Sequence, residues 1–261
     1  MKVEAVHADV VVVTSRIFQT TCTLVRRGEE AFCIDSPILP DELELLPTVA
    51  EQSSFSVVAV IATHQDWDHL LGRLAFAEAP LGVAASTADA LDTDPGAVQR
   101  GLRAFDDENY VVRSGPLALG TPQRLPVPGR LGLGDAELDL HPVRGHTRDG
   151  MAIGVPWARV LIVGDHLSPV EIPMVSDEDD AIDAYLATLD LLEPLVGEAE
   201  TVIPGHGGAL DSERALAILR EDRDYLRALS TGGAAAALPL ARRSDAQKAI
   251  HHQNVGRLTP G

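Results

Sequence analysis

The stretch Ala62–Gly72 gathers side chains that can bind metals or move protons directly after an apolar run. Its sequence, ATHQDWDHLLG, places one imidazole and two carboxylates on alternate positions, His64, Asp66 and Asp68, and His69 follows at once. Alternate residues of an extended chain point to the same side, so His64 and Asp66 can hold one cation. Asp68 and His69, at the turn into the next element, can hold a neighbouring cation.

Three more polar groups stand directly after predicted strands. His146 follows LDLHPVRG, Asp165 follows VLIVG, and His206 follows TVIPG. If Asp66, Asp68 and Asp165 converge, these like charges would raise one another's pKa or push the site apart. Divalent cations remove that conflict, and imidazoles fill the remaining coordination positions. The full set suits two ions better than one: His64, Asp66, Asp68, His69, His146, Asp165 and His206.

Short β-branched runs predict the strands that would position these groups. We expect strands over residues 9–15, 57–64, 123–145, 151–165 and 200–203, and a strand hairpin over 19–36. We expect helices over residues 39–52, 69–79, 177–195, 211–229 and 245–258, and short helices within 86–116. The chain runs from strands into mixed strands and helices twice over, which indicates two sheets packed face to face with helices outside.

The composition is ordinary for a globular protein, and its acidic balance narrows the partners. The formal net charge is −18 over 261 residues, and such a surface repels nucleic-acid phosphates and anionic lipids. We therefore expect a small-molecule substrate, no nucleic acid and no membrane contact. No bilayer-length segment and no signal peptide are visible, so a cytoplasmic protein is expected. Cys22 and Cys33 lie in apolar stretches and are expected to be reduced and buried.

Taken together, the motifs resemble the metallo-β-lactamase fold superfamily, whose pattern is H-x-H-x-D-H followed by a distant His, an Asp and a final His. Here HQDWDH, GHT, VGD and PGHG stand in that order, and the resemblance covers roughly residues 9–210. It implies an α+β protein, a four-layer αβ/βα sandwich with C-terminal helices. Residues 1–210 would form the metallo-β-lactamase-fold domain, with 86–116 as a variable insertion. Residues 211–261 would form a C-terminal helical extension packed on that domain or on a second copy, so a homodimer is left open.

The resemblance also implies two metal positions that share one ligand. The implied sets are His64, Asp66 and His146 for one metal, Asp68, His69 and His206 for the second, and Asp165 as the bridge.

Position 66 departs from the family pattern, because Asp66 stands where the family usually has His. A further carboxylate hardens the site and lowers its charge, which favours Fe or Mn more than an imidazole would. Zn2+ remains the first choice by family frequency. The alternative is that Asp66 does not ligate, so that one site is empty or weak. Two smaller departures are Leu71-Gly72, where the family has two glycines, and GHTRDG in place of GHTPGS.

The expected activity is that of a dinuclear metal-dependent hydrolase (EC 3). Two cations lower the pKa of a bridging water, roughly from 15.7 to near 7 in the zinc case. The hydroxide would attack a small ester, thioester, lactone or related substrate, and Asp68 would orient it as a catalytic residue. One alternative is an iron-dependent oxidoreductase of the same fold, persulfide-dioxygenase-like or diiron, because flavodiiron relatives carry a carboxylate at the position of Asp66. Another is a catalytically weak binding protein.

Candidates for substrate binding flank the motifs. Trp67 lies inside the first motif, Tyr110 lies in the variable segment, and His166 follows Asp165. Each also has a structural interpretation: Trp67 packed under its loop, Tyr110 on the surface, and His166 pointing away from the site. Asp149 is a candidate to accept a proton from a ligand histidine.

Overall fold

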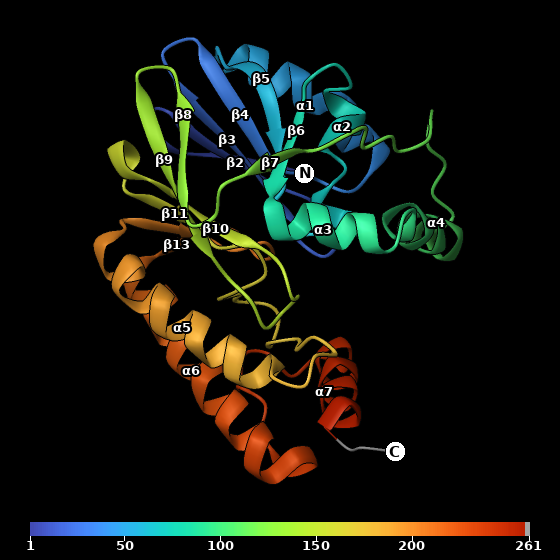
Figure 1. The fold of residues 1–261 in the computed structure, drawn as a ribbon, viewed down its shortest axis with the longest axis vertical. Coiled ribbons are helices and arrows are strands. Elements are labelled where there is room, and N and C mark those ends of the chain that lie inside the picture. The colour runs from blue at the N-terminus through green and yellow to red at the C-terminus, as the bar shows by residue number, and fades with distance from the viewer. Residues whose placement is uncertain (259–261) are drawn as a thin grey trace.

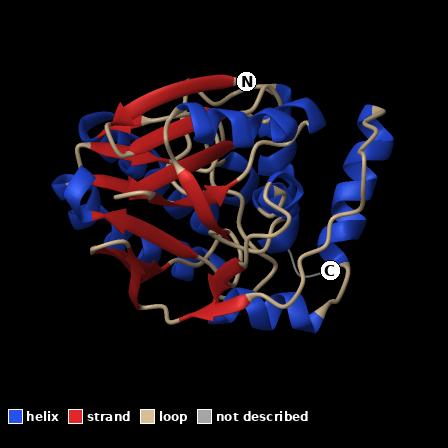
Figure 2. Ribbon diagram, turned by 90° about the horizontal axis from the view of Figure 1, so that it is seen from above, coloured by secondary structure: helices blue, strands red, loops and turns tan. Residues whose placement is uncertain are grey.

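The computed structural model describes residues 1–258 and contains two β-sheets packed face to face (Figure 1, Figure 2). The first sheet contains β1 (Lys2–His7), β2 (Val10–Thr14), β3 (Thr21–Arg27), β4 (Glu30–Asp35), β5 (Ser56–Ile61), β6 (Leu81–Ala84) and β7 (Gln123–Leu125). These strands lie side by side in chain order, antiparallel from β1 to β4 and parallel from β4 to β7. The carboxyl ends of β4 and β5 therefore lie at the same edge.

The second sheet contains β8 (Gly129–Leu133), β9 (Ala136–Pro142), β10 (Met151–Val155), β11 (Val160–Ile162), β12 (Thr201–Ile203) and β13 (Leu210–Asp211). Its order is β13-β12-β11-β10-β9-β8. Only β11 and β12 pair in parallel among these strands. The segments that follow β11 and β12 thus leave the sheet at one edge.

Helices cover the outer face of each sheet (Figure 1). The first sheet carries α1 (Pro40–Gln52), α2 (Gly72–Ala75), α3 (Ala85–Thr93) and α4 (Ala97–Asn109). The second carries α5 (Ala181–Glu198) and α6 (Ser212–Gly232), and α7 (Asp245–Leu258) lies beyond them. This layering is the predicted αβ/βα sandwich with C-terminal helices, and the short helices expected within 86–116 are α3 and α4.

The four valines of β2 show how the layers are joined. Val10 and Val12 belong to the core between the two sheets, whereas Val11 and Val13 belong to the core under the helices of the first sheet. Successive strand side chains point to opposite faces, so a strand buried on both faces has an uninterrupted apolar sequence. A third core joins the second sheet to α5 and α6.

The helix predicted over residues 69–79 is wrong. The chain forms a 3-10 turn, η1 (Trp67–His69), and then only α2. Gly72 lies so close to β5 that a Cβ there would come 2.7 Å from Val60 Cγ1. This close approach leaves room for one helical turn, and Phe76 already has non-helical backbone angles.

The other predicted helices are confirmed, α7 with the predicted bounds and the rest with shifted ends. The helix expected from residue 177 begins at Ala181, and α6 begins after Asp211, whose side chain accepts a hydrogen bond from Arg214 N. Cys22 and Cys33 are buried and unbonded, with their Sγ atoms 3.5 Å apart across the β3–β4 hairpin. Over residues 1–258, no helix has the length and apolarity that a bilayer crossing requires. The division of the chain at residue 210 stays a prediction. The last three residues of the predicted C-terminal extension, 259–261, lie outside the described residues.

Candidate metal centre

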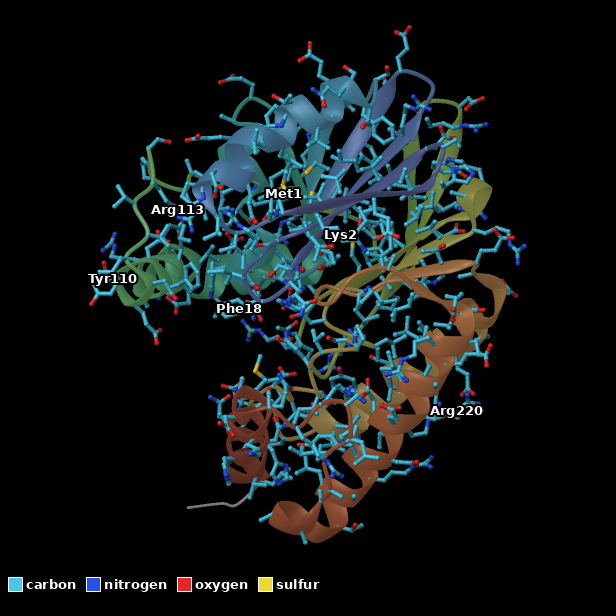
Figure 3. The ribbon with its side chains drawn as sticks, turned by 180° about the vertical axis from the view of Figure 1, so that it is seen from behind. Met1, Lys2, Phe18, Tyr110, Arg113 and Arg220 are labelled. Carbon is cyan, nitrogen blue, oxygen red and sulfur yellow. The ribbon has the colours of Figure 1, made fainter. Side chains whose placement is uncertain are left out.

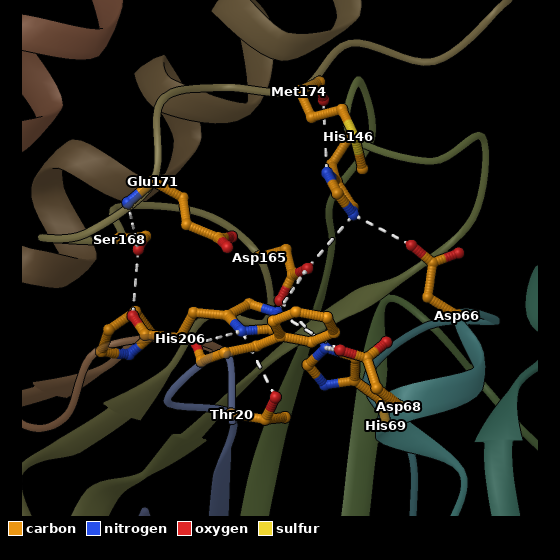
Figure 4. A network of polar contacts seen from close by, with 12 residues as sticks. Thr20, Asp66, Asp68, His69, His146, Asp165, Ser168, Glu171, Met174 and His206 are labelled. Carbon is orange, nitrogen blue, oxygen red and sulfur yellow. Dashed lines mark hydrogen bonds and ion pairs between the residues drawn. The ribbon is translucent and has the colours of Figure 1, made fainter. Parts of the chain in front are cut away.

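The seven predicted donor side chains meet at one edge of the two sheets (Figure 4). The segments after β5, β9, β11 and β12 supply them, so strands distant in sequence deliver their polar groups to one place. The donors form two groups, His64, Asp66, His146 and Asp165 in the first, and Asp68, His69 and His206 in the second.

The first group brings two imidazoles and two carboxylates within coordinating reach of one point. All four donor atoms lie within 4.8 Å of one another. His146 Nε2 lies 3.2 Å from Asp66 Oδ2 and 3.2 Å from Asp165 Oδ2. His64 Nε2 lies 3.6 Å from Asp66 Oδ2. Asp66 therefore faces the same point as both histidines.

The second group is joined to the first through Asp165. His206 Nε2 lies 3.6 Å from Asp68 Oδ2 and 3.2 Å from Asp165 Oδ2. His69 Nε2 lies 3.1 Å from Asp165 Oδ1 and 3.8 Å from Asp68 Oδ2. Asp165 thus stands between the two groups and presents its carboxylate to both.

Each histidine turns its Nε2 toward this centre because its Nδ1 has an outer partner. The hydrogen-bond partners are Thr63 Oγ1 for His64 at 3.0 Å, Met174 O for His146 at 3.2 Å and Phe18 O for His206 at 3.0 Å. For His69 the outer partner is an ionic one, because its Nδ1 lies 3.0 Å from the Asp35 carboxylate without a hydrogen bond. Carbonyl and carboxylate oxygens only accept, and the Thr63 hydroxyl already donates to Asp35 Oδ2. In the neutral imidazoles, Nδ1 therefore carries the proton and Nε2 presents a lone pair.

Asp35 is a functional residue that the sequence analysis missed. It is buried at the end of β4, where Oδ1 accepts a hydrogen bond from Thr63 N at 2.8 Å and Oδ2 faces His69. Asp149, the residue suggested for this role, does not fill it: it lies near His64 and His146, but its buried carboxylate has no hydrogen-bond partner among the described residues. Asp35 could have been found as one more acid at the carboxyl end of a predicted strand.

Without a cation, the buried imidazoles and carboxylates keep one another charged. Burial by itself lowers the pKa of His206, but Asp165 and the neighbouring carboxylates outweigh it and raise the pKa to about 10. The same opposition raises the pKa values of His69 and His146 well above normal. Burial by itself raises the pKa of Asp165, but the surrounding imidazoles hold it well below its usual range.

The donor set fits divalent cations. His64 Nε2, His69 Nε2 and Asp165 Oδ1 are buried and have no hydrogen-bond partner within the described part of the chain. Such orphaned polar atoms are costly unless a ligand satisfies them. Mixed imidazole and carboxylate donors suit zinc, iron and manganese. The two groups are consistent with a dinuclear metal site.

Gly205 of the PGHG motif allows the two sheets to meet at the centre. A Cβ at this position would overlap Asp165 Oδ1 and lie 2.9 Å from His69 Cε1. Gly205 N also donates to Gly164 O at 2.6 Å, which ties the segment before His206 to the segment before Asp165. Only glycine permits this close approach.

A cavity of about 540 Å³ opens beside Asp66 and His146. Trp67 lines it and packs against Phe105 of α4, with ring centroids 4.8 Å apart. The cavity wall also includes residues of α3, of α4 and of the loop before α5. The structure therefore places one of the three predicted substrate contacts at this cavity.

The other two predicted contacts lie outside its lining. Tyr110 is 92% exposed at the far end of α4 (Figure 3). His166 is buried, with its Nδ1 and Nε2 3.2 and 3.4 Å from the carbonyl oxygens of Val163 and Arg144. Burial lowers the pKa of His166 to about 4, so it is neutral near pH 7.

Comparison with known proteins agrees with this fold. The profile described as the metallo-beta-lactamase superfamily matches residues 16–206. The DIM-1 metallo-β-lactamase is 20% identical, with 88% of this chain and 97% of that one covered and a TM-score of 0.60. A metallo-β-lactamase family protein from Thermus thermophilus is 18% identical, with coverage of 87% and 83% and a TM-score of 0.65.

A stereoselective inverting sec-alkylsulfatase from Pseudomonas sp. is 16% identical, with a TM-score of 0.68. The match covers 87% of this chain and 42% of the sulfatase. At these identities the solved structures establish the fold, and the matched profile establishes the family. The chain belongs to the metallo-β-lactamase superfamily and has the His/Asp metal-binding groups of its metallohydrolases.

Proposed function

We propose that this chain is a dinuclear metal-dependent hydrolase of small molecules. The observation that carries the proposal is the convergence of seven buried or half-buried donors whose imidazoles all turn Nε2 inward. In this proposal the ligand sets are His64, Asp66 and His146 for one cation, Asp68, His69 and His206 for the other, and Asp165 between them.

The bound cations would supply an activated water and polarisation of the substrate oxygen. The chain's own contribution is to position the groups around that water. Asp68, at the rim of the second group, is proposed to accept a hydrogen bond from the attacking water and so orient it. Water adds across the scissile bond, giving an acid and an alcohol or thiol. Neither cysteine can serve as the nucleophile, because Cys22 and Cys33 are buried within the β3–β4 hairpin.

The cavity beside the centre supports a small substrate. Its volume of about 540 Å³ is within the usual range for small-molecule sites. Leu91, Val98 and Trp67 give it an apolar wall. Its charged lining combines Arg148 and Arg257 with four acids, Asp66, Asp94, Asp177 and Glu178. An ester, thioester or lactone with an apolar group matches this lining. The β-lactamase and alkylsulfatase names of the similar structures add cyclic amides and sulfate esters to the compounds to test.

Zn2+ is the proposed metal by family frequency, and Asp66 keeps Fe and Mn in consideration. The carboxylate at this position also supports the second candidate, an iron-dependent oxidoreductase. The expectations of cytoplasmic location, of no nucleic-acid or membrane partner and of a homodimer remain proposals that rest on the sequence.

One purification separates these candidates. The protein is isolated without added metal, Zn, Fe and Mn are measured per chain, and a visible spectrum is recorded. Two zinc ions, a colourless sample and chelator-sensitive hydrolysis of p-nitrophenyl esters, thioesters, lactones or sulfate esters are expected. Iron with oxygen-dependent spectral changes favours the oxidoreductase. Protein replete in metal but inert across the whole panel overturns the hydrolase proposal.

A further inference from the structure

Residues Ser168–Val175, here called the strap, cross the metal centre on the side opposite the sheet edge. The strap lies between β11 and α5 and has no helix or strand of its own. Met174 O lies 3.2 Å from Nδ1 of His146 and accepts its hydrogen bond. The strap also brings Glu171 into the centre, and Figure 4 shows its carboxylate directed toward Asp165.

Glu171 forms a third donor group that no sequence motif indicated. Its carboxylate, Asp165 and His206 have donor atoms within 4.8 Å of one another. Among residues 1–258, no cationic side chain pairs with the Glu171 carboxylate and no hydrogen bond reaches it. Burial raises the pKa of Glu171. A half-buried acid beside the carboxylate of Asp165 therefore has only the imidazoles of the centre to offset its charge.

Three buried side chains from the C-terminal part of the chain hold the strap by its backbone. Arg242 Nη1 donates to Glu171 O at 2.8 Å and to Ser168 O at 3.3 Å. Gln247 Oε1 accepts from Ile172 N at 2.7 Å. Two of these contacts hold the peptide bond between Glu171 and Ile172, and the third holds Ser168, so together they fix the backbone from which the Glu171 side chain projects.

Asn254 holds the other end of the strap. Its Oδ1 accepts from Val175 N at 3.1 Å, and its Nδ2 donates to Pro173 O at 2.7 Å. Arg242, Gln247 and Asn254, here called the anchors, are all at least nine-tenths buried. All three follow residue 206, where the match to the family profile ends.

We propose that Glu171 is an additional carboxylate ligand at the second metal position, beside His206 and Asp165, and that the anchors position it. The inference rests on the proposed dinuclear site. With Asp66, Asp68 and Asp165, Glu171 makes four carboxylates, whose charge two divalent cations balance. Glu171 gives the second position a harder donor set than its two imidazoles, Asp68 and the shared Asp165 would alone.

The test compares Glu171→Gln with wild type and with Asp179→Asn. Asp179 is an exposed acid just beyond the strap, so its substitution makes the same charge change away from the centre. Metal-free proteins are titrated with Zn2+ and separately with Mn2+ against a chromogenic chelator, which reports stoichiometry and affinity without any substrate. We expect wild type and D179N to bind two equivalents, and E171Q to bind the second at least tenfold more weakly with the first unchanged.

Two equivalents bound by E171Q with wild-type affinity would overturn the inference and leave the dinuclear proposal standing. Failure of wild type to bind two equivalents would instead overturn the dinuclear proposal. Thermal unfolding of metal-free E171Q is the folding control. Its midpoint should stay close to that of wild type, because the substitution keeps the side-chain shape and removes no hydrogen bond of the Glu171 carboxylate.

A pair of Gln247 variants tests the positioning role. Gln247→Ala removes the acceptor for Ile172 N, whereas Gln247→Glu keeps it. We expect Q247A to weaken the second equivalent several-fold and Q247E to restore it toward wild type. If Q247A and wild type bound the second metal equivalent with equal affinity, the anchors would have no role in positioning Glu171.

Discussion

The sheet side and the strap side of the metal centre are positioned by different kinds of interaction. On the sheet side, His64, Asp165 and His206 follow strands whose backbone ladders fix them. On the strap side, Glu171 and Met174 lie in a segment without a ladder, held by side chains more than 70 residues away. A strand tip distributes its support over many backbone bonds, whereas the strap depends on a few individual side chains. Single substitutions should therefore affect the two sides differently.

The largest effect is expected from Asp165→Asn, because this residue faces both donor groups. The loss of metal affinity should exceed the 10- to 100-fold that is expected when a residue that merely supports a ligand is removed. Metal content and chelator-sensitive hydrolysis should fall together. Asp107→Asn, an exposed change on α4, is the matched control. A D165N protein that still holds two ions would show that the sheet side does not depend on a shared carboxylate.

Asp35→Asn should come next, because it disturbs a residue that orients a donor from the sheet side. The amide cannot accept from both Thr63 N and Thr63 Oγ1 as the carboxylate does, and it loses the negative charge that faces His69. We expect metal affinity to drop about 10- to 100-fold and the free energy of unfolding to fall by about 1–3 kcal/mol. Calorimetric metal titration and denaturant unfolding measure the two. Unchanged values for both would mean that β4 contributes nothing to the centre.

On the strap side, Asn254→Ala should lower stability more than it alters the first metal position. The substitution leaves Val175 N and Pro173 O without their partner, at a cost of about 1–3 kcal/mol. Gln253→Ala, an exposed change on the same helix, should be neutral. Thermal unfolding and the affinity for the first metal equivalent are compared. If N254A lost as much affinity for the first metal equivalent as D165N does, the sheet side and the strap side would not be positioned independently.

The smallest expected effect is a difference in pH dependence between metal-free and metal-loaded protein. An imidazole with a raised folded-state pKa stabilises the metal-free protein below its unfolded value of about 6.5. For His206 that contribution is lost as the pH rises toward about 10. Asp66 and Asp165 have lowered pKa values, so their contribution is present above about 3.9 and is lost in acid.

Metal-free protein should therefore be most stable between about pH 4 and 6.5, and its melting temperature should decline above that range. Cations replace the protons on these imidazoles, so metal-loaded protein should resist this alkaline decline. Melting temperatures from pH 4 to 10, with and without a chelator, give the comparison. If the melting temperatures with and without a chelator changed in parallel across this pH range, the inward-facing imidazoles would not titrate as a group.

The sequence predicted the sheet side far better than the strap side, for a physical reason. The valines of β2 and the apolar runs before His64, Asp165 and His206 carry a local pattern that indicates buried strands. Those strands bring the predicted donors together, and their roles as metal ligands stay a proposal. The strands β1, β6 and β13 were missed, since β1 exposes most of its side chains and β6 and β13 have only four and two residues.

The contacts that Asp35 and Glu171 make could not be predicted from their own neighbourhoods. Asp35 reaches His69 only because β4 and β5 pair in parallel, which is a long-range property. Glu171 lies in an irregular segment whose course depends on Arg242 and Gln247. Local periodicity contains no information about such contacts, and the helix wrongly predicted over 69–79 failed for a related reason: its close approach to β5 is tertiary.

The distance in sequence between the strap and its anchors bears on the order in which the protein matures. Chains emerge from the ribosome N-terminus first, and early segments can fold before later ones are made. The residues that fix the strap, from Arg242 to Asn254, are translated after every strand of both sheets. The nascent chain can therefore assemble the sheet-side donors while the strap is still free, which leaves an open route for ions to enter before the anchors dock.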